Sequence, residues 1–295
     1  MSGSRFLLAC FAMSIGLGLA APATAVELRP TTNWAVDYAE DSCALFRSFG
    51  HEGRTVTIEM RQFSPEQEDM RFIVKSDSFQ VPDRPFRGKT VRFAPSEQEY
   101  SVGDMVHMRF PDGDQGATFS VNFFSTEGDQ NTLPVGTQRA AVVAAILDTT
   151  NAVELNYVFN REVLLRTGNL AAPLSALGTC MEELQSHWGI DVEAHRKLLR
   201  YAAPRNWEIL AREIQDSYPN WQTQLGRQAI LRIRLAVSTE GRATDCHMQA
   251  RLGDEDFERI ACEILLRSAL FEPALDAHGD ALASYYILTV QYRVE

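Results

Sequence analysis

The sequence predicts an α+β protein with two folded parts, an antiparallel β-rich domain that ends in a helix and a smaller domain of two strands, a helix and a third strand. Between Trp34 and Phe159, apolar and polar residues mainly alternate with the period of two that is typical of strands. At residues 173–189 the apolar residues instead recur at helical spacing. Beyond residue 205, strand, strand, helix and strand patterns follow in that order.

The first 25 residues have the pattern of a signal peptide. Arg5 is followed by an uncharged, mostly apolar run, and Ala23-Thr24-Ala25 has the small residues that a signal peptidase requires. We therefore expect cleavage after Ala25, which leaves an exported periplasmic protein that begins at Val26 and has no membrane span. The alternative is that residues 6–26 are retained as a membrane anchor.

The overall composition indicates a folded, acidic protein. Apolar residues make up 45% of the chain, and the formal net charge is −11. Because an acidic chain is repelled by the phosphate backbone, the composition argues against nucleic-acid binding. It does not predict an oligomeric state.

The β-rich domain is expected to span residues 26–189. Its predicted helices lie at residues 137–150 and 173–189, and the second has Pro173 near its start and Gly189 at its end. An Asp- and Gly-rich turn at 111–116 separates two of the strands. The predicted strands lie at residues 54–62, 69–77, 105–110, 117–124, 153–160 and 161–168.

A charged connector is expected at residues 190–204, before a second domain at 205–295. This domain opens with a short helix at 206–219 and continues with a strand at 229–237, in which Leu231, Ile233 and Leu235 share one face. The later predicted elements are a returning strand at 242–250, a helix at 254–270 with acidic residues in its first turn, and a final strand at 283–294.

Four cysteines remain once the signal is removed: Cys43, Cys180, Cys246 and Cys262. An even number of cysteines in an exported chain favours two disulfides, although four cysteines allow three connectivities. The division into domains favours local pairing, of Cys43 with Cys180 and of Cys246 with Cys262. A thiolate site for metal or catalysis is the competing interpretation of the second pair.

Residues 205–295 resemble the C-terminal domain of TonB, which couples the inner membrane to outer-membrane transporters. The resemblance rests on an ordered set of short motifs and covers about a third of the chain, and residues 26–190 resemble no family that we can name. The motifs are Tyr218-Pro219, Gly226, Glu240-Gly241-Arg242, Phe257-Glu258-Arg259, Phe271-Glu272-Pro273-Ala274 and Gly279.

The resemblance implies a TonB-like ββαβ fold that recognises a protein partner. In that fold the second strand packs on the helix, which would bring Cys246 close to Cys262. The final strand would then add to an extended segment of an outer-membrane receptor. The partner-binding residues implied are Gln215, Tyr218 and Pro219 before the first strand, and Tyr286, Leu288 and Val290 on the last, although ordinary sheet packing explains these aromatic and aliphatic residues as well.

The sequence offers little for catalysis or metal binding. Cys246 and His247 are neighbours on a predicted strand and would point to opposite faces, so they would not converge on a metal. The six histidines are scattered, and the sequence has no GxSxG, HExxH, CxxC or Gly-rich phosphate motif. We therefore predict no catalytic residue, no metal site and no cofactor.

Three hypotheses follow for the function. The first is a periplasmic, non-catalytic protein-binding protein linked to outer-membrane transport. The second is a membrane-anchored energy transducer of TonB type, although the chain has a globular domain where such transducers have a Pro-rich spacer. The third is an envelope enzyme with its site in the β-rich domain.

Overall fold

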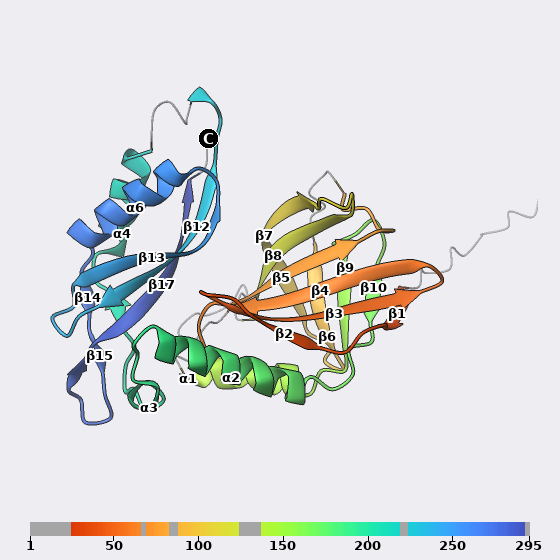
Figure 1. The fold of residues 1–295 in the computed structure, drawn as a ribbon, viewed down its shortest axis with the longest axis horizontal. Coiled ribbons are helices and arrows are strands. Elements are labelled where there is room, and N and C mark those ends of the chain that lie inside the picture. Colours follow the sequence, from red (N-terminus) through yellow and green to blue (C-terminus); the bar gives the residue numbers. More distant parts are fainter. Residues whose placement is uncertain (1–24, 66–68, 83–87, 124–136, 219–223, 293–295) are drawn as a thin grey trace, which may run out of the picture.

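The computed structural model describes residues 25–65, 69–82, 88–123, 137–218 and 224–292. Figure 1 shows a strand-rich body and a smaller sheet-and-helix unit, with helices beneath the strand-rich body. The predicted signal peptide, residues 1–25, lies outside the described residues except for Ala25. The first strand, β1, begins at Val26, the residue that follows the predicted cleavage site.

Ten strands form the sheet of the N-terminal domain, in the order β1-β10-β9-β6-β7-β8-β5-β4-β3-β2. Neighbouring strands are antiparallel except for β1 and β10. The strands are β1 (Val26–Pro30), β2 (Ala35–Tyr38), β3 (Cys43–His51), β4 (Arg54–Gln62), β5 (Asp69–Ser76), β6 (Thr90–Ala94), β7 (Glu99–Arg109), β8 (Gln115–Asn122), β9 (Ala152–Asn156) and β10 (Val163–Leu165).

The sheet closes on itself into a nine-stranded barrel, because β1 pairs at one end with β10 and at the other with β3. Val26 lies opposite Val163 in the first pairing, and Arg29 lies opposite Gly50 in the second. The strand β2 extends the sheet beyond the closure by pairing with β3. Closure was not part of the sequence-based prediction, which specified only an antiparallel β-rich domain.

Aromatic side chains form the centre of the barrel core. The ring of Phe72 on β5 stacks on that of Phe119 on β8, with ring centroids 5.6 Å apart. Phe93 on β6 packs against both Phe123 and Tyr100, at 5.3 and 5.8 Å. Because side chains on a strand alternate between its two faces, these inward residues leave the intervening polar residues on the outside of the barrel.

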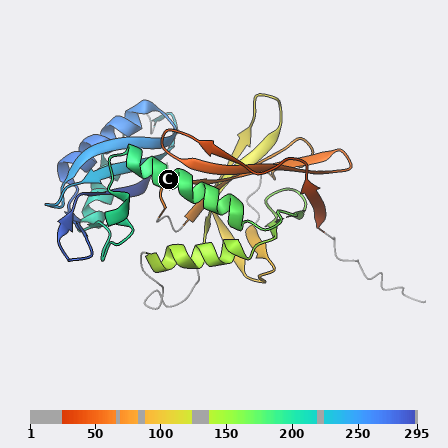
Figure 2. The same ribbon diagram turned by 60° about the horizontal axis from the view of Figure 1, so that its bottom comes forward.

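Two helices pack against the barrel and contribute apolar residues to its core, α1 (Thr137–Asp148) and α2 (Ala171–His187). Figure 2 shows them side by side, with α2 against the barrel. The predicted disulfide between Cys43 and Cys180 is confirmed, and it joins β3 to α2 with a Cα–Cα distance of 6.2 Å. The N-terminal domain is therefore β-rich with a terminal helix, as the sequence predicts.

The predicted connector contains regular structure. Residues Val192–His195 form the short helix α3, and Asp191 begins it by accepting a hydrogen bond from the backbone N–H of Ala194. Further along, β11 (Ala203–Pro204) pairs with β14 (Phe271–Glu272). The connector is therefore attached to the C-terminal part of the fold.

The C-terminal domain has a three-stranded sheet, in the order β13-β12-β17, and the helices α4 and α6. The strands are β12 (Ala229–Val237), β13 (Ala243–Leu252) and β17 (Ser284–Tyr292), and the helices are α4 (Trp207–Asp216) and α6 (Glu255–Ser268). The short strands β15 (Ala274–Leu275) and β16 (Ala281–Leu282) form a small hairpin before β17. The predicted elements are all present in this region.

The disulfide between Cys246 and Cys262 is also confirmed and joins β13 to α6, with a Cα–Cα distance of 5.7 Å. It excludes these two cysteines as a thiolate site in the oxidised protein. Two disulfides in one chain are typical of proteins that fold in an oxidising compartment. No helix within the described ranges is long and apolar enough to cross a membrane.

The turn between β12 and β13 depends on Gly241. Its φ is +73°, and a Cβ atom at this position would lie 2.1 Å from the carbonyl oxygen of Phe271. That carbonyl belongs to β14, and the N–H of Phe271 donates a hydrogen bond to the carbonyl oxygen of Gly241. Glycine is required here because a side chain would separate the hairpin from the strand behind it.

Candidate functional site

The C-terminal sheet has two faces with different environments. Alternate residues of β12, such as Leu231, Ile233 and Leu235, are fully buried on the face that α4 and α6 cover. The intervening residues Arg232 and Arg234 point to the opposite face, toward Phe63 and Trp188 of the N-terminal domain. The sheet is thus a middle layer between its own helices and the N-terminal domain.

The predicted partner-binding residues of β17 lie on the helix face. Leu288 and Val290 are buried in the domain core, and Tyr286 packs against Phe271 with ring centroids 5.4 Å apart. These side chains therefore anchor β17 to the domain. A partner that added to this strand would contact its backbone and not the side chains of Leu288 and Val290.

The other predicted partner residues lie near the end of α4. Gln215 is exposed, whereas the ring of Tyr218 packs against the rings of both Phe257 and Tyr292, at 5.5 and 5.4 Å. Tyr218 therefore has a packing role that the sequence pattern did not indicate. Pro219 lies outside the described residues.

The two edges of the sheet differ in regularity. Against β12, β17 keeps one unbroken register from Ser284 to Tyr292. The pairing of β13 with β12 is interrupted by two register shifts, one next to Ile233 and one next to Val237. Irregular edges resist further pairing, so β17 is the edge better suited to accept another strand. Within the described part of the chain, β17 pairs with β12 alone.

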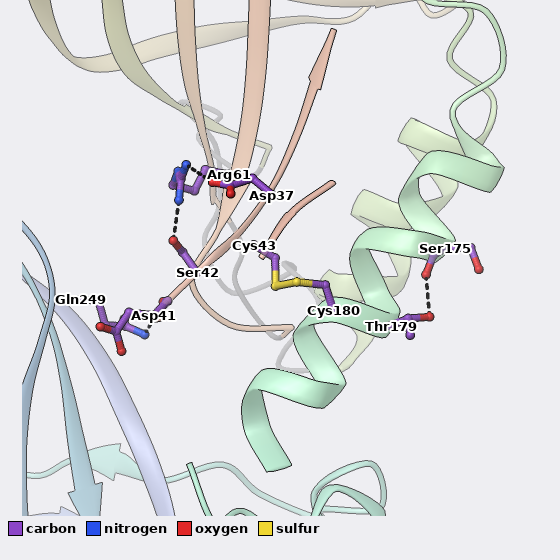
Figure 3. Close-up of a disulfide and its surroundings, with 9 residues drawn as sticks. All are labelled: Asp37, Asp41, Ser42, Cys43, Arg61, Ser175, Thr179, Cys180 and Gln249. Carbon is purple, nitrogen blue, oxygen red and sulfur yellow. Dashed lines mark hydrogen bonds and ion pairs between the residues drawn. A yellow bond between two sulfur atoms is a disulfide. The ribbon is translucent and has the colours of Figure 1, made fainter. Parts of the chain in front are cut away.

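The first register shift also positions Gln249 against the barrel. Its side-chain Nε2 donates to the carbonyl oxygens of Asp41 and Phe63, at 3.2 Å each. Figure 3 shows Gln249 reaching Asp41, which precedes β3 close to the Cys43–Cys180 disulfide. Nearby, Nε2 of His247 lies 2.7 Å from Oδ1 of Asp41. One strand thus supplies several polar contacts between the domains.

Replacing Gln249 with alanine is expected to loosen the attachment of the two domains. The substitution removes both hydrogen bonds and leaves the carbonyl groups of Asp41 and Phe63 without these donors, which should cost about 2 kcal/mol of interdomain stability. The effect is measured by limited proteolysis, in which the connector at residues 190–206 should be cleaved faster in the variant than in the parent protein. The exposed Gln80→Ala substitution is the control, and equal cleavage rates in the two variants would show that Gln249 does not hold the domains together.

A second interdomain contact is centred on Trp188, at the end of α2. The guanidinium of Arg234 lies over its ring, 4.4 Å from the centroid, and Tyr285 meets the ring edge-on at 5.5 Å. Arg234 is only 9% exposed, and its burial lowers the pKa of its guanidinium. A buried cation on an aromatic face is a strong contact because little water competes for it.

Next to this interface, a buried histidine of the connector contacts a buried serine of β17. Nδ1 of His195 lies 2.9 Å from the carbonyl oxygen of Asp191, which can only accept, so Nδ1 carries the proton. In the neutral ring Nε2 is then an acceptor, and the hydroxyl of Ser284 donates to it at 2.9 Å.

The sequence contains no local signal for this pair, because its members are 89 residues apart. A serine that donates to a histidine resembles a nucleophile with its base. However, His195 and Ser284 are 3% and 5% exposed, so the hydroxyl is closed to a substrate in this arrangement. The pair therefore serves as a contact that fixes the connector helix α3 to β17.

The described residues contain no group of three or more His, Cys, Asp or Glu side chains arranged to hold a metal ion. No family model matches the sequence, and comparisons with curated proteins and with solved structures also find no match.

Proposed function

We propose that this chain is an exported, non-catalytic protein-binding protein whose C-terminal domain pairs β17 with an extended segment of a partner. The observation that carries the proposal is the unbroken register of β17 at the edge of the sheet, next to a bulged edge on the other side. Main-chain hydrogen bonds would supply the affinity, and the buried side chains of Leu288 and Val290 would keep the strand in place.

The resemblance of residues 205–295 to the TonB C-terminal domain supports a particular partner class. It favours the N-terminal periplasmic segment of an outer-membrane receptor, with Gln215 near the docked segment. The two disulfides support export to an oxidising compartment, here the periplasm. The same proposal includes a TonB-like ββαβ fold, a cleaved signal and a link to outer-membrane transport.

Synthetic peptides that copy such receptor segments are expected to bind the oxidised protein and to slow amide hydrogen exchange in β17. The expected protection falls on residues 287–292, because their strand gains a neighbour, while residues 243–252 of β13 serve as the internal control. Hydrogen-exchange mass spectrometry with and without peptide measures both strands in the same sample.

A peptide of the same sequence with N-methylated alternate residues is the matched control. N-methylation removes backbone donors and retains the side chains, so affinity should fall about tenfold or more if strand addition operates. Equal affinity of the two peptides, or protection of β13 instead of β17, would contradict the proposal. The Gln215→Ala variant, compared with Arg212→Ala on the same helix, then tests the contact that the resemblance implies.

A further inference from the structure

A groove of about 350 Å³ lies between α1 and α2, and residues at the end of β4 also line it. The two helices run side by side against the barrel (Figure 2). A groove of this volume accommodates one small molecule. It belongs to the N-terminal domain and shares no described lining residue with β17.

Buried apolar side chains form the floor of this groove. Val143 and Leu147 lie one turn apart on α1, and Leu177 and Met181 lie one turn apart on α2. All four are buried in the core of the N-terminal domain, and all four line the groove. Each helix thus presents a short apolar stripe, and the two stripes together offer a surface for an aliphatic chain.

A glycine of α2 leaves this groove open. Gly178 lies in the interior of the helix, where glycine is less favourable than alanine. A Cβ atom built at this position would meet no atom within 4 Å outside the backbone of its own helix, so the packing of α1 on α2 does not require a glycine. Because Gly178 lines the groove, a side chain at this position would occupy space within it.

The charge of the lining favours a cation. Asp148 is the only charged residue among the described lining residues, and Gln62 is the only other polar one. Asp148 is the last residue of α1, where the helix dipole disfavours an acid, and the last turn of this helix has no basic residue. Across the described ranges no basic side chain forms an ion pair with Asp148. A bound cation would therefore stabilise both the carboxylate and the end of the helix.

We propose that this groove binds a small amphipathic amine, with its ammonium group at Asp148 and its aliphatic chain along Leu147, Leu177 and Met181. The described lining contains no arginine or lysine that would hold an acid of the same shape. This site does not involve the edge of β17, and the proposal does not rest on the proposed partner.

Octylammonium is a suitable probe, with octanoate as the anion of the same chain length and octan-1-ol as the uncharged analogue. Isothermal titration of the oxidised protein without its signal is expected to show binding of octylammonium at one site and in preference to both analogues. Butylammonium should bind about tenfold more weakly or worse, because it buries fewer methylene groups. Bound octylammonium should also raise the midpoint of thermal unfolding, because it binds the folded state.

The D148N variant tests the position of the ammonium group. It is expected to weaken octylammonium binding about fivefold, as the loss of one partly solvated ion pair predicts, and to leave the binding of octan-1-ol unchanged. Asp216 is the last residue of α4 and lies outside the groove. The D216N variant therefore makes the same change at the same position of another helix, and it should bind octylammonium as the parent does.

The G178L variant tests the position of the aliphatic chain. Its side chain would occupy the groove, so octylammonium binding is expected to fall about tenfold or more. In G178A the unliganded protein should unfold at a higher temperature, because alanine favours the helix. Circular dichroism of the unliganded variants checks their folds, and D148N remains informative if G178L does not fold. Binding of octanoate as tight as that of octylammonium, full affinity in D148N, full affinity in folded G178L, or no octylammonium binding would each overturn the proposal.

Discussion

Replacing Cys43 and Cys180 together with serine is expected to lower the free energy of unfolding of the barrel by about 5 kcal/mol. The two cysteines are 137 residues apart, so their bond closes a long loop and removes much of the conformational freedom of the unfolded chain. The bond also attaches α2 to β3, where both cysteines are buried. Urea denaturation of the oxidised variant and the parent, followed by circular dichroism, measures the difference.

The second disulfide provides the matched comparison. Cys246 and Cys262 are 16 residues apart, and loop closure of that length predicts a stabilisation of about 3 kcal/mol. The C246S/C262S variant should therefore lose less stability than the C43S/C180S variant. If the two double variants lost the same free energy, or if the order were reversed, loop length would not be the main source of stabilisation in this protein.

The sequence was most informative where one face of an element is buried and the other is not. In β4, Val56, Ile58 and Met60 are fully buried while their neighbours are not, which is the alternation that identified the strand. In β3, however, Cys43, Ala44 and Leu45 are all buried, because both faces of the strand are covered at this point. The alternation is lost, and with it the local signal for a strand.

Closure of the barrel was not predictable from periodicity. It depends on β1, which pairs with β10 and with β3, strands that are far apart in the sequence. A period of two in a short strand indicates which side chains are inward, but it contains no information on which strand lies alongside. The regular segments of the C-terminal domain were easier to identify because β12 and β13 form a hairpin with a short turn.

The candidate site was only partly predictable for a related reason. Arg232 and Arg234 alternate with buried residues of β12, as the polar residues of a solvent-exposed face would. The sequence does not distinguish a face in water from a face against a second domain, so the contacts of Arg234 with Trp188 and of Arg232 with Phe63 were missed. The two cysteine pairings were predictable because few connectivities exist and each domain holds one pair.

Alkaline conditions are expected to destabilise the C-terminal domain through Tyr292. This side chain is fully buried at the end of β17, with its ring 4.7 Å from that of Phe257, and burial raises the pKa of its hydroxyl to about 12 from an ordinary value of 10.0. Between these two pH values the folded protein keeps the proton and the unfolded chain releases it. Stability therefore falls as the pH rises through this window, by roughly 3 kcal/mol in total.

The Tyr292→Phe variant isolates this contribution, because phenylalanine preserves the packing and cannot ionise. Within the described residues the hydroxyl of Tyr292 has no hydrogen-bond partner, so its removal should not lower stability at neutral pH. Urea denaturation at pH 8 and pH 11.5 should then show that the free energy of unfolding falls less with rising pH in the variant than in the parent. Tyr38→Phe, at an exposed tyrosine, is the control for removal of a phenol. If stability fell equally steeply with rising pH in Tyr292→Phe and in the parent, the ionising group responsible would lie elsewhere in the protein.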